Sequence, residues 1–302
     1  MKNLSDLTVI IVTFNTPKKI IFDCLNSINK DVSILIVENS NSFIYENSLL
    51  TEFPNVKIVC TGENLGYGKG NNFGMNQVKS DYVLILNPDV ICDKKLFSNI
   101  ISVIQKVKNF TVIGCQYLKD DIFMPAGFFD RKKNINFIED FKNDNIKSLS
   151  KVEWVTGCSI LLNLKKFKNK DIFDKNFFLY FEEFDLCKSI TKNGGEIYTS
   201  SELKIHHLGF KSSLSDDETK NLNTINIKDW HYMWSSFYFY KKNYNFIYAL
   251  GKLSGKLLKS FLKMIFFSLT FQRNNKNKYL HRFLGLFNSI IGRPSNFRGK
   301  LN

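Results

Sequence analysis

The first hundred residues alternate short, uniformly apolar runs with segments of helical periodicity, and this alternation restricts the fold more than any other feature of the chain. Strands this uniformly apolar are typical of a parallel sheet covered on both faces. The pattern therefore predicts a doubly wound α/β domain. Thr16 is placed to cap the first helix, and Pro17 suits its first turn. The expected strands are 7–14, 32–37, 56–60 and 82–86, and the expected helices are 17–28 and 71–78.

Composition and cysteine spacing exclude several classes of protein. The chain has 302 residues, of which 44% are hydrophobic and 23% charged, so a disordered or fibrous protein is excluded. The six cysteines form no C-x-x-C pair and no tight cluster, which indicates reduced thiols and no disulfide scaffold or structural zinc site. The apolar run 7–14 is too short for a signal peptide or a membrane span. We therefore expect a cytoplasmic protein.

The positive charge is concentrated at one end of the chain. The net charge is +14, and residues 230–302 hold nine Lys and four Arg with no Asp or Glu. The rest of the chain is close to neutral. Together with the change of pattern along the sequence, this predicts two α/β halves, 1–110 and 111–215, followed by a helical cationic tail, 216–302.

Polar residues follow directly after three of the apolar runs. They are Thr13-Phe14-Asn15, Glu38-Asn39-Ser40 and Asn87-Pro88-Asp89. In open α/β sheets, ligands bind outside the carboxyl ends of the strands, so these are the positions where a site is expected. The Asp89 carboxylate can hold a hard divalent cation whose other ligands are diphosphate oxygens, although Asn, Pro and Asp also form ordinary turns.

A glycine-rich segment, 64–74, precedes the second helix and contains Gly66, Gly68, Gly70 and Gly74. Glycine lets backbone N–H groups approach phosphate oxygens at a helix N-terminus. The spacing is neither that of a P-loop nor that of a dinucleotide fingerprint. The segment alone fits a phosphate cradle and a flexible turn equally well.

Three carboxylates stand among aromatic and aliphatic residues in the stretch 177–187. They are Glu182, Glu183 and Asp185. Mutual repulsion and burial raise the pKa of clustered carboxyls, which suits a general base near neutral pH. The other interpretation is the start of an amphipathic helix, where acidic residues are favoured by the helix dipole.

Taken together, the segments VIIVTFN, IVENS, ENLGYGKGNNFG and YVLILNPDV resemble, in this order, the nucleotide-sugar-binding half of inverting glycosyltransferase family 2. The similarity is to its rhamnosyltransferase-like branch, in which N-P-D replaces D-x-D. The resemblance implies a GT-A fold, a mostly parallel sheet flanked by helices, here with a helical basic C-terminal extension. It implies that Asp89 binds Mg²⁺ or Mn²⁺. It also implies a donor-binding set, namely Thr13, Asn15, Glu38, Asn39, Asn64, Gly66, Asn71 and Asn87.

The same resemblance assigns roles in the second half. The acidic stretch is similar to the motif F-F-x-Y-F-E-D-x-D-L-C, whose second acid is the candidate base; here that position is Glu183, followed in our order by Asp185 and Glu182. Residues 206–213 resemble H-x-G-x-x-S-S, which implies that His207, with His206 as the alternative, approaches the metal. Trp154 and Gly157 would line the acceptor pocket, although a core strand explains them equally well.

The resemblance implies transfer of a hexose, with rhamnose expected first, from a dTDP- or UDP-linked donor to a glycan or lipid-linked acceptor in cell-surface polysaccharide synthesis. One alternative is a catalytically impaired relative that binds sugar nucleotide, since Glu183 departs from the family's Asp. A nucleic-acid-binding protein would use the basic tail but leaves the strand ends unexplained, so no nucleic-acid partner is expected. A nucleotidyltransferase would carry a basic glycine loop where T-F-N-T-P stands.

Residues 246–271 of the tail are apolar but carry four lysines, at 252, 256, 259 and 263. On a helix these lysines form one stripe about 60° wide. A basic amphipathic helix without acids is typical of binding to an anionic membrane surface, here its inner face. Lysines at mid-stretch argue against a spanning helix. The alternative is a helix packed on the protein with its lysines solvated.

Overall fold

The computed structural model describes residues 1, 3–118, 126–142, 148–209 and 218–299. The chain divides into two compact units. Unit 1 comprises residues 1–173 and 186–213, and unit 2 comprises residues 174–185 and 214–302. The predicted boundary at residue 110 stays a prediction. The acidic segment 174–185 lies in the same unit as the C-terminal helices, which its place in the sequence does not indicate.

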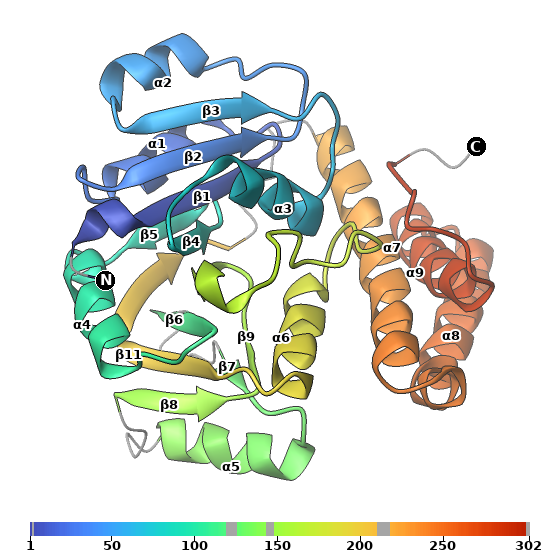
Figure 1. Ribbon diagram of the computed structural model, residues 1–302. Coiled ribbons are helices and arrows are strands. Elements are labelled where there is room, and N and C mark those ends of the chain that lie inside the picture. The colour runs from blue at the N-terminus through green and yellow to red at the C-terminus, as the bar shows by residue number, and fades with distance from the viewer. Residues whose placement is uncertain (2, 119–125, 143–147, 210–217, 300–302) are drawn as a thin grey trace. The chain divides into compact units, whose positions relative to one another are not determined.

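The first half of unit 1 is a parallel sheet, as the apolar runs predicted (Figure 1). The strands lie side by side in the order β3-β2-β1-β4. Their bounds are Leu7–Thr13 for β1, Ser33–Glu38 for β2, Val56–Cys60 for β3 and Tyr82–Leu86 for β4. Parallel pairing brings their carboxyl ends to one edge of the sheet.

The second half of the sheet mixes both directions. Strand β10 lies antiparallel between β4 and β6, while β11 runs parallel to β6 and antiparallel to β5 and β8. The bounds are Val90–Cys92 for β5, Val112–Leu118 for β6, Leu149–Val152 for β8, Ser159–Asn163 for β10 and Ile197–His207 for β11. A separate pair is formed by β7 (Ala126–Gly127) and β9 (Trp154–Val155). The α/β class is confirmed, and the parallel character belongs mainly to the first half.

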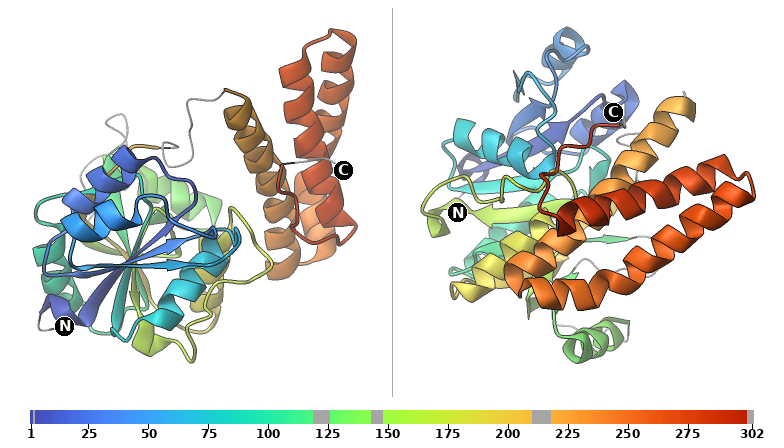
Figure 2. Two further views of the ribbon diagram at one scale, coloured as in Figure 1. Left: turned by 90° about the horizontal axis from the view of Figure 1, so that it is seen from above. Right: turned by 90° about the vertical axis from the view of Figure 1, so that its right-hand side faces the viewer.

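Helices cover both faces of the sheet, seen edge-on in the left panel of Figure 2. Alternate side chains of β1 point to opposite faces: Val9 and Ile11 pack with helices α1 and α4, and Ile10 packs with α3 and the part of α6 that belongs to unit 1. The helices that lie wholly in unit 1 are α1 (Lys18–Asn26), α2 (Glu46–Glu52), α3 (Tyr67–Gln77), α4 (Leu96–Lys106) and α5 (Arg131–Lys142). Helix α6 (Glu182–Lys192) begins in unit 2 and continues in unit 1. Short 3₁₀ turns lie at Leu4–Asp6 and Leu164–Lys166.

The start of α1 differs from the expectation. Pro17 occupies the N-cap position and its carbonyl accepts hydrogen bonds from Ile20 and Ile21. No side chain caps the helix, so the predicted capping by Thr16 is wrong. Thr16 lies buried one residue before the cap, and its hydroxyl has no hydrogen-bond partner among the described residues.

Helix α3 begins at Tyr67, four residues earlier than predicted, and takes three of the glycines into the helix. Two of them permit close packing on the sheet. A Cβ at Gly70 would lie 2.8 Å from Val12 Cγ1, and one at Gly74 would lie 2.9 Å from Val37 Cγ2. These glycines therefore serve helix–sheet contact, and neither lies in a flexible turn.

In unit 2 the described helices are α7 (Glu218–Asn243), α8 (Phe246–Leu269) and α9 (Arg273–Ile290), which confirms a helical tail. These helices, drawn in the right panel of Figure 2, have a hydrophobic core of their own. Its residues are Met233, Phe237, Ala249, Leu253 and Leu286. A second cluster joins Trp230 and Trp234 of α7 to Phe297 of the C-terminal segment.

Two further findings concern the cysteines and the length of the helices. All six cysteines are free thiols, five of them buried. Across the helices that the structure describes, none combines the length and the apolar character that crossing a bilayer requires.

Candidate functional site

Two of the predicted donor-binding residues contact each other at the ends of β1 and β2. The parallel register places Thr13 opposite Glu38, and the Thr13 hydroxyl donates a hydrogen bond of 2.6 Å to Glu38 Oε2. Both side chains are buried. Asn15, two residues on, has a φ of 51°, a left-handed conformation that turns the chain away at the end of the strand.

The loop before α3 is fixed to the same edge. Asn39 Nδ2 donates to the carbonyl of Gly66 (3.0 Å), whose own N–H donates to Asn64 Oδ1 (3.0 Å). Gly66 has a φ of 80°, which favours glycine. Asn71 is fully buried; its amide nitrogen donates to the Tyr67 carbonyl, and its Oδ1 lacks a protein partner among the described residues. The structure thus brings Asn39, Asn64 and Gly66 together.

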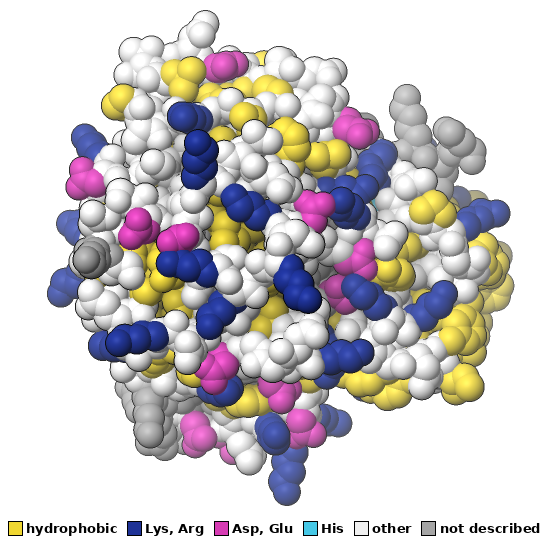
Figure 3. Space-filling model, in the orientation of Figure 1, with side chains coloured by type: hydrophobic (Ala, Val, Ile, Leu, Met, Phe, Trp, Pro, Cys, Tyr) yellow, Lys and Arg dark blue, Asp and Glu magenta, His cyan; other side chains and the backbone are white. Residues whose placement is uncertain are grey.

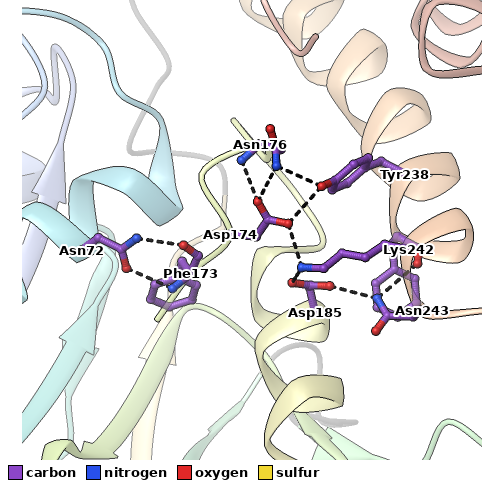
Figure 4. A network of polar contacts seen from close by, with 9 residues as sticks. Asn72, Phe173, Asp174, Asn176, Asp185, Tyr238, Lys242 and Asn243 are labelled. Atoms are coloured by element: carbon purple, nitrogen blue, oxygen red, sulfur yellow. Dashed lines mark hydrogen bonds and ion pairs between the residues drawn. The ribbon is translucent and has the colours of Figure 1, made fainter. Parts of the chain in front are cut away.

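Sequence reasoning missed the contacts that join α3 to the second half of unit 1. The Tyr67 hydroxyl donates to the carbonyl of Gly157 (2.5 Å), a residue predicted to line the acceptor pocket. Asn72 exchanges two hydrogen bonds with the backbone of Phe173, at 2.8 and 3.0 Å (Figure 4). Trp154, in β9, is partly exposed. These pairs lie about one hundred residues apart, so no local pattern indicates them.

Asp89 and His207 lie side by side. The antiparallel pairing of β5 and β11 sets His207 opposite Val90, and His207 Nε2 lies 3.3 Å from Asp89 Oδ1. Asp89 is only 1% exposed, while His206, the alternative, is exposed. The tight turn that was the other interpretation is present as well, since Val90 N–H donates to the carbonyl of Asn87. Residues 210–213 of the histidine segment lie outside the described residues.

This pair offers a carboxylate and an imidazole to a divalent cation. Both are groups that bind such ions, and carboxylate oxygen suits Mg²⁺ and Mn²⁺. Over the described ranges, no group of three or more His, Cys, Asp or Glu side chains could form a complete protein cage. Two protein ligands with the other positions left to diphosphate oxygens agree with this donor set.

The three acids begin helix α6, so both sequence interpretations describe it: they form a cluster and they occupy the first helical turn. Glu182 is 1% exposed, and its Oε1 has no hydrogen-bond partner among the described residues. Burial, reinforced by the charge of Glu183, raises the pKa of Glu182 well above its usual value. Glu182 therefore gives up its proton less readily than an exposed glutamate does.

Asp185 is in the opposite situation. Its Oδ2 accepts from Lys242 Nζ (2.6 Å) and its Oδ1 accepts from Asn243 Nδ2 (2.9 Å), both on α7. These bonds occupy both oxygens of the Asp185 carboxylate. Glu183 is partly exposed, unlike the two acids that flank it. Sequence reasoning missed Lys242, because it lies 57 residues from Asp185 in the chain.

The backbone in front of the acids is strained. Tyr180 and Phe181 have φ values of 70° and 69°, and neither is glycine. Such conformations are unfavourable for bulky residues and concentrate at functional sites. Asp185 N–H donates to the carbonyl of Phe181, which closes the first turn of α6 directly after the strained pair.

Solved structures share this fold. A mannosyltransferase from Pyrobaculum calidifontis, solved with GDP-Man and Mn²⁺, aligns with a TM-score of 0.53 at 11% identity, over 94% of this chain and 87% of that one. S. aureus TarS 1–349 in complex with UDP-GlcNAc aligns with a TM-score of 0.51 at 15% identity, over 95% and 92%. GalNAc-T7, solved with UDP, GalNAc and Mn²⁺, gives 0.53 at 11% identity, over 86% and 58%. The fold is thus that of the GT-A glycosyltransferases.

The family follows from the sequence comparison. The model of "Glycosyl transferase family 2" matches residues 8–180, more than half of the chain. The chain belongs to this family, which confirms the resemblance seen in the sequence.

Named relatives are distant. "Low-salt glycan biosynthesis hexosyltransferase Agl10" of Haloferax volcanii is 24% identical over 61% of this chain, and the match spans 61% of that protein's length. "Rhamnosyltransferase WbbL" of Escherichia coli K12 is 23% identical over 60% of this chain and 74% of its own length. An "N-acetylglucosaminyl-diphospho-decaprenol L-rhamnosyltransferase" of Mycobacterium tuberculosis is 22% identical over 59% and 67%.

Proposed function

We propose that this protein is an inverting glycosyltransferase that moves a sugar from a nucleotide-diphosphate donor to an acceptor hydroxyl. The observation that carries the proposal is the buried Asp89 carboxylate beside His207 at the carboxyl edge of the sheet. The hydrogen-bonded residues that end β1 and β2 and precede α3 belong to unit 1 with this pair. Family membership and the GT-A fold support the same assignment.

For the donor side, we assign Asp89 and His207 to a Mg²⁺ or Mn²⁺ ion. When bound, such an ion would neutralise charge on the donor diphosphate as it leaves. Asn87 holds the turn that presents Asp89, because its carbonyl accepts from Val90 N–H. Thr13, Asn15, Glu38, Asn39, Asn64, Gly66 and Asn71 are proposed to contact the nucleotide sugar.

For the acceptor side, we assign the general base to Glu183. Glu182 is buried with a raised pKa, and both oxygens of Asp185 are occupied by α7, so these two acids are less suited to take up a proton. Glu183 would accept the proton of the acceptor hydroxyl. The hydroxyl oxygen would then attack the anomeric carbon on the face opposite the leaving diphosphate. Trp154 and Gly157 are proposed to line the acceptor pocket.

We propose rhamnose as the transferred sugar, carried on dTDP or UDP. Two of the relatives are named as rhamnosyltransferases, and one of those names contains a lipid-linked saccharide acceptor. A glycan or lipid-linked acceptor in cell-surface polysaccharide synthesis is consistent with both names.

We further propose that unit 2 holds the enzyme on the inner, anionic face of a membrane. One face of α8 packs on the other helices through Ala249, Leu253 and Ser260. The remaining surface of α8 and the turn after it expose large apolar side chains, with Ile247 81% and Phe271 93% exposed. Figure 3 shows hydrophobic side chains gathered on the part of the surface where α8 lies, with Lys or Arg side chains beside them. Exposed apolar patches of this kind mark interaction surfaces.

The experiment separates donor binding from transfer. Nucleotide sugars are first screened by thermal shift with Mn²⁺, and donor hydrolysis or transfer is then measured for the best ligand. We expect Glu183→Gln to lower kcat by about 10²–10⁴-fold with donor affinity unchanged, because only proton removal is lost. We expect Asp89→Asn to weaken metal-dependent donor binding itself.

Glu52→Gln serves as the matched control, since Glu52 is an exposed glutamate of α2. It should leave both quantities unchanged. Undiminished turnover in Glu183→Gln would remove Glu183 from the role of base. Failure of the wild-type protein to bind any nucleotide sugar would contradict the proposed function as a whole.

A further inference from the structure

One stripe of helix α7 contacts the acidic segment 174–185 over its whole length. His231, Ser235, Tyr238 and Lys242 follow one another at helical spacing and so share a face. The ring centroids of His231 and Phe178 lie 4.6 Å apart, and the Tyr238 ring packs edge-on against Phe177 at a centroid distance of 4.9 Å. Between these contacts, the Ser235 hydroxyl donates a hydrogen bond of 2.8 Å to the carbonyl of Leu179. Both partners of every contact belong to unit 2.

Lys242 is the last residue of this stripe, and it forms ion pairs with the first and the last residue of the acidic segment (Figure 4). Its ammonium lies 2.7 Å from Asp174 Oδ2 and 2.6 Å from Asp185 Oδ2. Asp174 also accepts from the Tyr238 hydroxyl and from Asn176, and Asp185 accepts from Asn243. Asp174 and Asp185 are thus bridged by one cation supplied from α7.

The bridge is electrostatically well formed. Burial opposes ionisation of Asp174, but hydrogen bonds from Lys242, Asn176 and Tyr238 outweigh it and lower the pKa of Asp174. Burial likewise opposes the charge of Lys242, but the two carboxylates outweigh it and raise the pKa of Lys242. The shifts of Asp174 and Lys242 both favour the charged pair, and charge-assisted bonds of this length are the strong ones.

The segment needs such bracing because of its backbone. Tyr180 and Phe181, with left-handed φ, stand directly before Glu182 and Glu183. Strained residues keep their conformation only when the surrounding structure fixes them from several sides. The contacts at Phe177, Phe178 and Leu179 hold one side of the strained pair, and Lys242 holds the other through Asp185.

We propose that Lys242 is a positioning residue for the transfer reaction, acting through Asp185 to fix the first turn of α6 and with it the carboxylate of Glu183. This inference rests on the proposed function and adds that α7, the first of the three helices described in unit 2, is part of the catalytic apparatus. Asp185 then has a structural role in the same turn, and its two bonds to α7 are the reason. Lys242 itself touches no substrate in this scheme.

The test uses the full-length protein and steady-state kinetics of donor turnover with Mn²⁺. We expect Lys242→Met to lower kcat about 10²-fold, because misplacing a reacting group by about 1 Å has an effect of that size. The donor KM should stay within about twofold, since the proposed donor-binding residues belong to unit 1. Lys242→Arg, which keeps the charge and can bridge two carboxylates, should restore kcat to within about tenfold of wild type.

Lys241→Met is the matched control, because Lys241 is the exposed neighbour on α7, and it should behave like wild type. If Lys242→Met does not fold, as judged by circular dichroism and donor binding, Asn243→Ala replaces it, with an expected fall in kcat of about tenfold. Equal kcat in the Lys242 or Asn243 variant and in Lys241→Met would overturn the inference, as would failure of Lys242→Arg to restore activity. A wild-type protein without donor binding or turnover contradicts the proposed function instead.

Discussion

The three acids at the start of α6 are neighbours in sequence but occupy three different environments. Glu182 is enclosed, Glu183 is partly exposed, and Asp185 is held by two side chains of α7. Charge at each position therefore has a different effect on stability. An ionised carboxylate at Glu182 is unfavourable because burial removes its solvation, whereas the Asp185 carboxylate accepts hydrogen bonds from Lys242 and Asn243.

Glu182 provides a test at the scale of a single residue. Its pKa is raised in the folded protein, so the folded state binds the proton more tightly than the unfolded state does, and stability falls as pH rises above the ordinary value of 4.5. Glu182→Gln removes this dependence. We expect the variant to melt at a higher temperature than wild type at pH 8, and the difference to shrink at pH 5.

Calorimetry at both pH values measures this effect. Glu52→Gln, at an exposed position on α2, should shift the melting temperature little and equally at both pH values. A Glu182→Gln variant that is less stable than wild type at pH 8 would show that the carboxylate is ionised and satisfied in the folded protein.

At this scale the sequence was a better guide to the candidate site residues than to their hydrogen-bond partners. Asp89 and His207 were paired through their motifs, and they do lie 3.3 Å apart. The partners of Asp185 could not be predicted, because a bond from Lys242 depends on how α7 packs on the acidic segment. Nothing within a few residues of Lys242 distinguishes it from the exposed Lys241.

At the scale of elements, buried strands were the most predictable part. Strands β3 and β4 have the predicted bounds. All five side chains of β4 are buried, and a strand covered on both faces needs an apolar side chain at every position. Strand β3 lies at the edge of the sheet and is only partly buried, but its mostly apolar sequence still marked it. The start of α3 was missed, since glycine is a poor helix former and propensity argues for a loop there. Packing on β1 and β2 outweighs propensity at Gly70 and Gly74.

Gly74 and Gly255 make a matched pair of helical glycines. A Cβ at Gly74 would lie 2.9 Å from Val37 and 3.0 Å from Ile10 side-chain atoms, whereas a Cβ at Gly255 of α8 meets nothing within 4 Å. We expect Gly74→Ala to lower the free energy of unfolding by about 1–3 kcal/mol through overpacking. We expect Gly255→Ala to raise it by about 0.5–1 kcal/mol through reduced backbone freedom in the unfolded chain.

Differential scanning calorimetry distinguishes the two effects, because opposite shifts of the melting temperature are expected from the same chemical change. Equal destabilisation by both substitutions would mean that the close approach of α3 to the sheet does not decide the outcome at Gly74.

At the scale of the whole molecule, the stretch of the chain with basic but no acidic residues lies in unit 2, the unit that we propose binds the membrane. The cationic residues that follow Trp230 belong to unit 2, whose core is small and whose α8 leaves a broad apolar surface exposed. The sequence indicated this helix and its lysine stripe. It could not separate the face that packs on α7 and α9 from the face that stays exposed, because both are apolar.

Binding to lipid vesicles tests this division. On α8 the large apolar residues Leu258, Leu262 and Leu269 are exposed, and so are Lys252 and Lys259. We expect the protein to sediment with vesicles that contain anionic lipid, less with purely neutral vesicles, and less in high salt, because the lysines act through the surface potential.

Two sets of substitutions separate charge from apolar contact in that experiment. Replacing Lys252 and Lys259 with Gln should weaken binding about 30-fold, at about 1 kcal/mol for each lysine near the surface. The same change at the exposed Lys30 and Lys94 of unit 1 should leave binding unchanged. The double substitution Leu258→Ser and Leu262→Ser should abolish the vesicle binding that remains in high salt, because that binding depends on apolar contact. Binding that is indifferent to both α8 variants would mean that a different surface meets the membrane, and no binding to anionic vesicles would contradict membrane association itself.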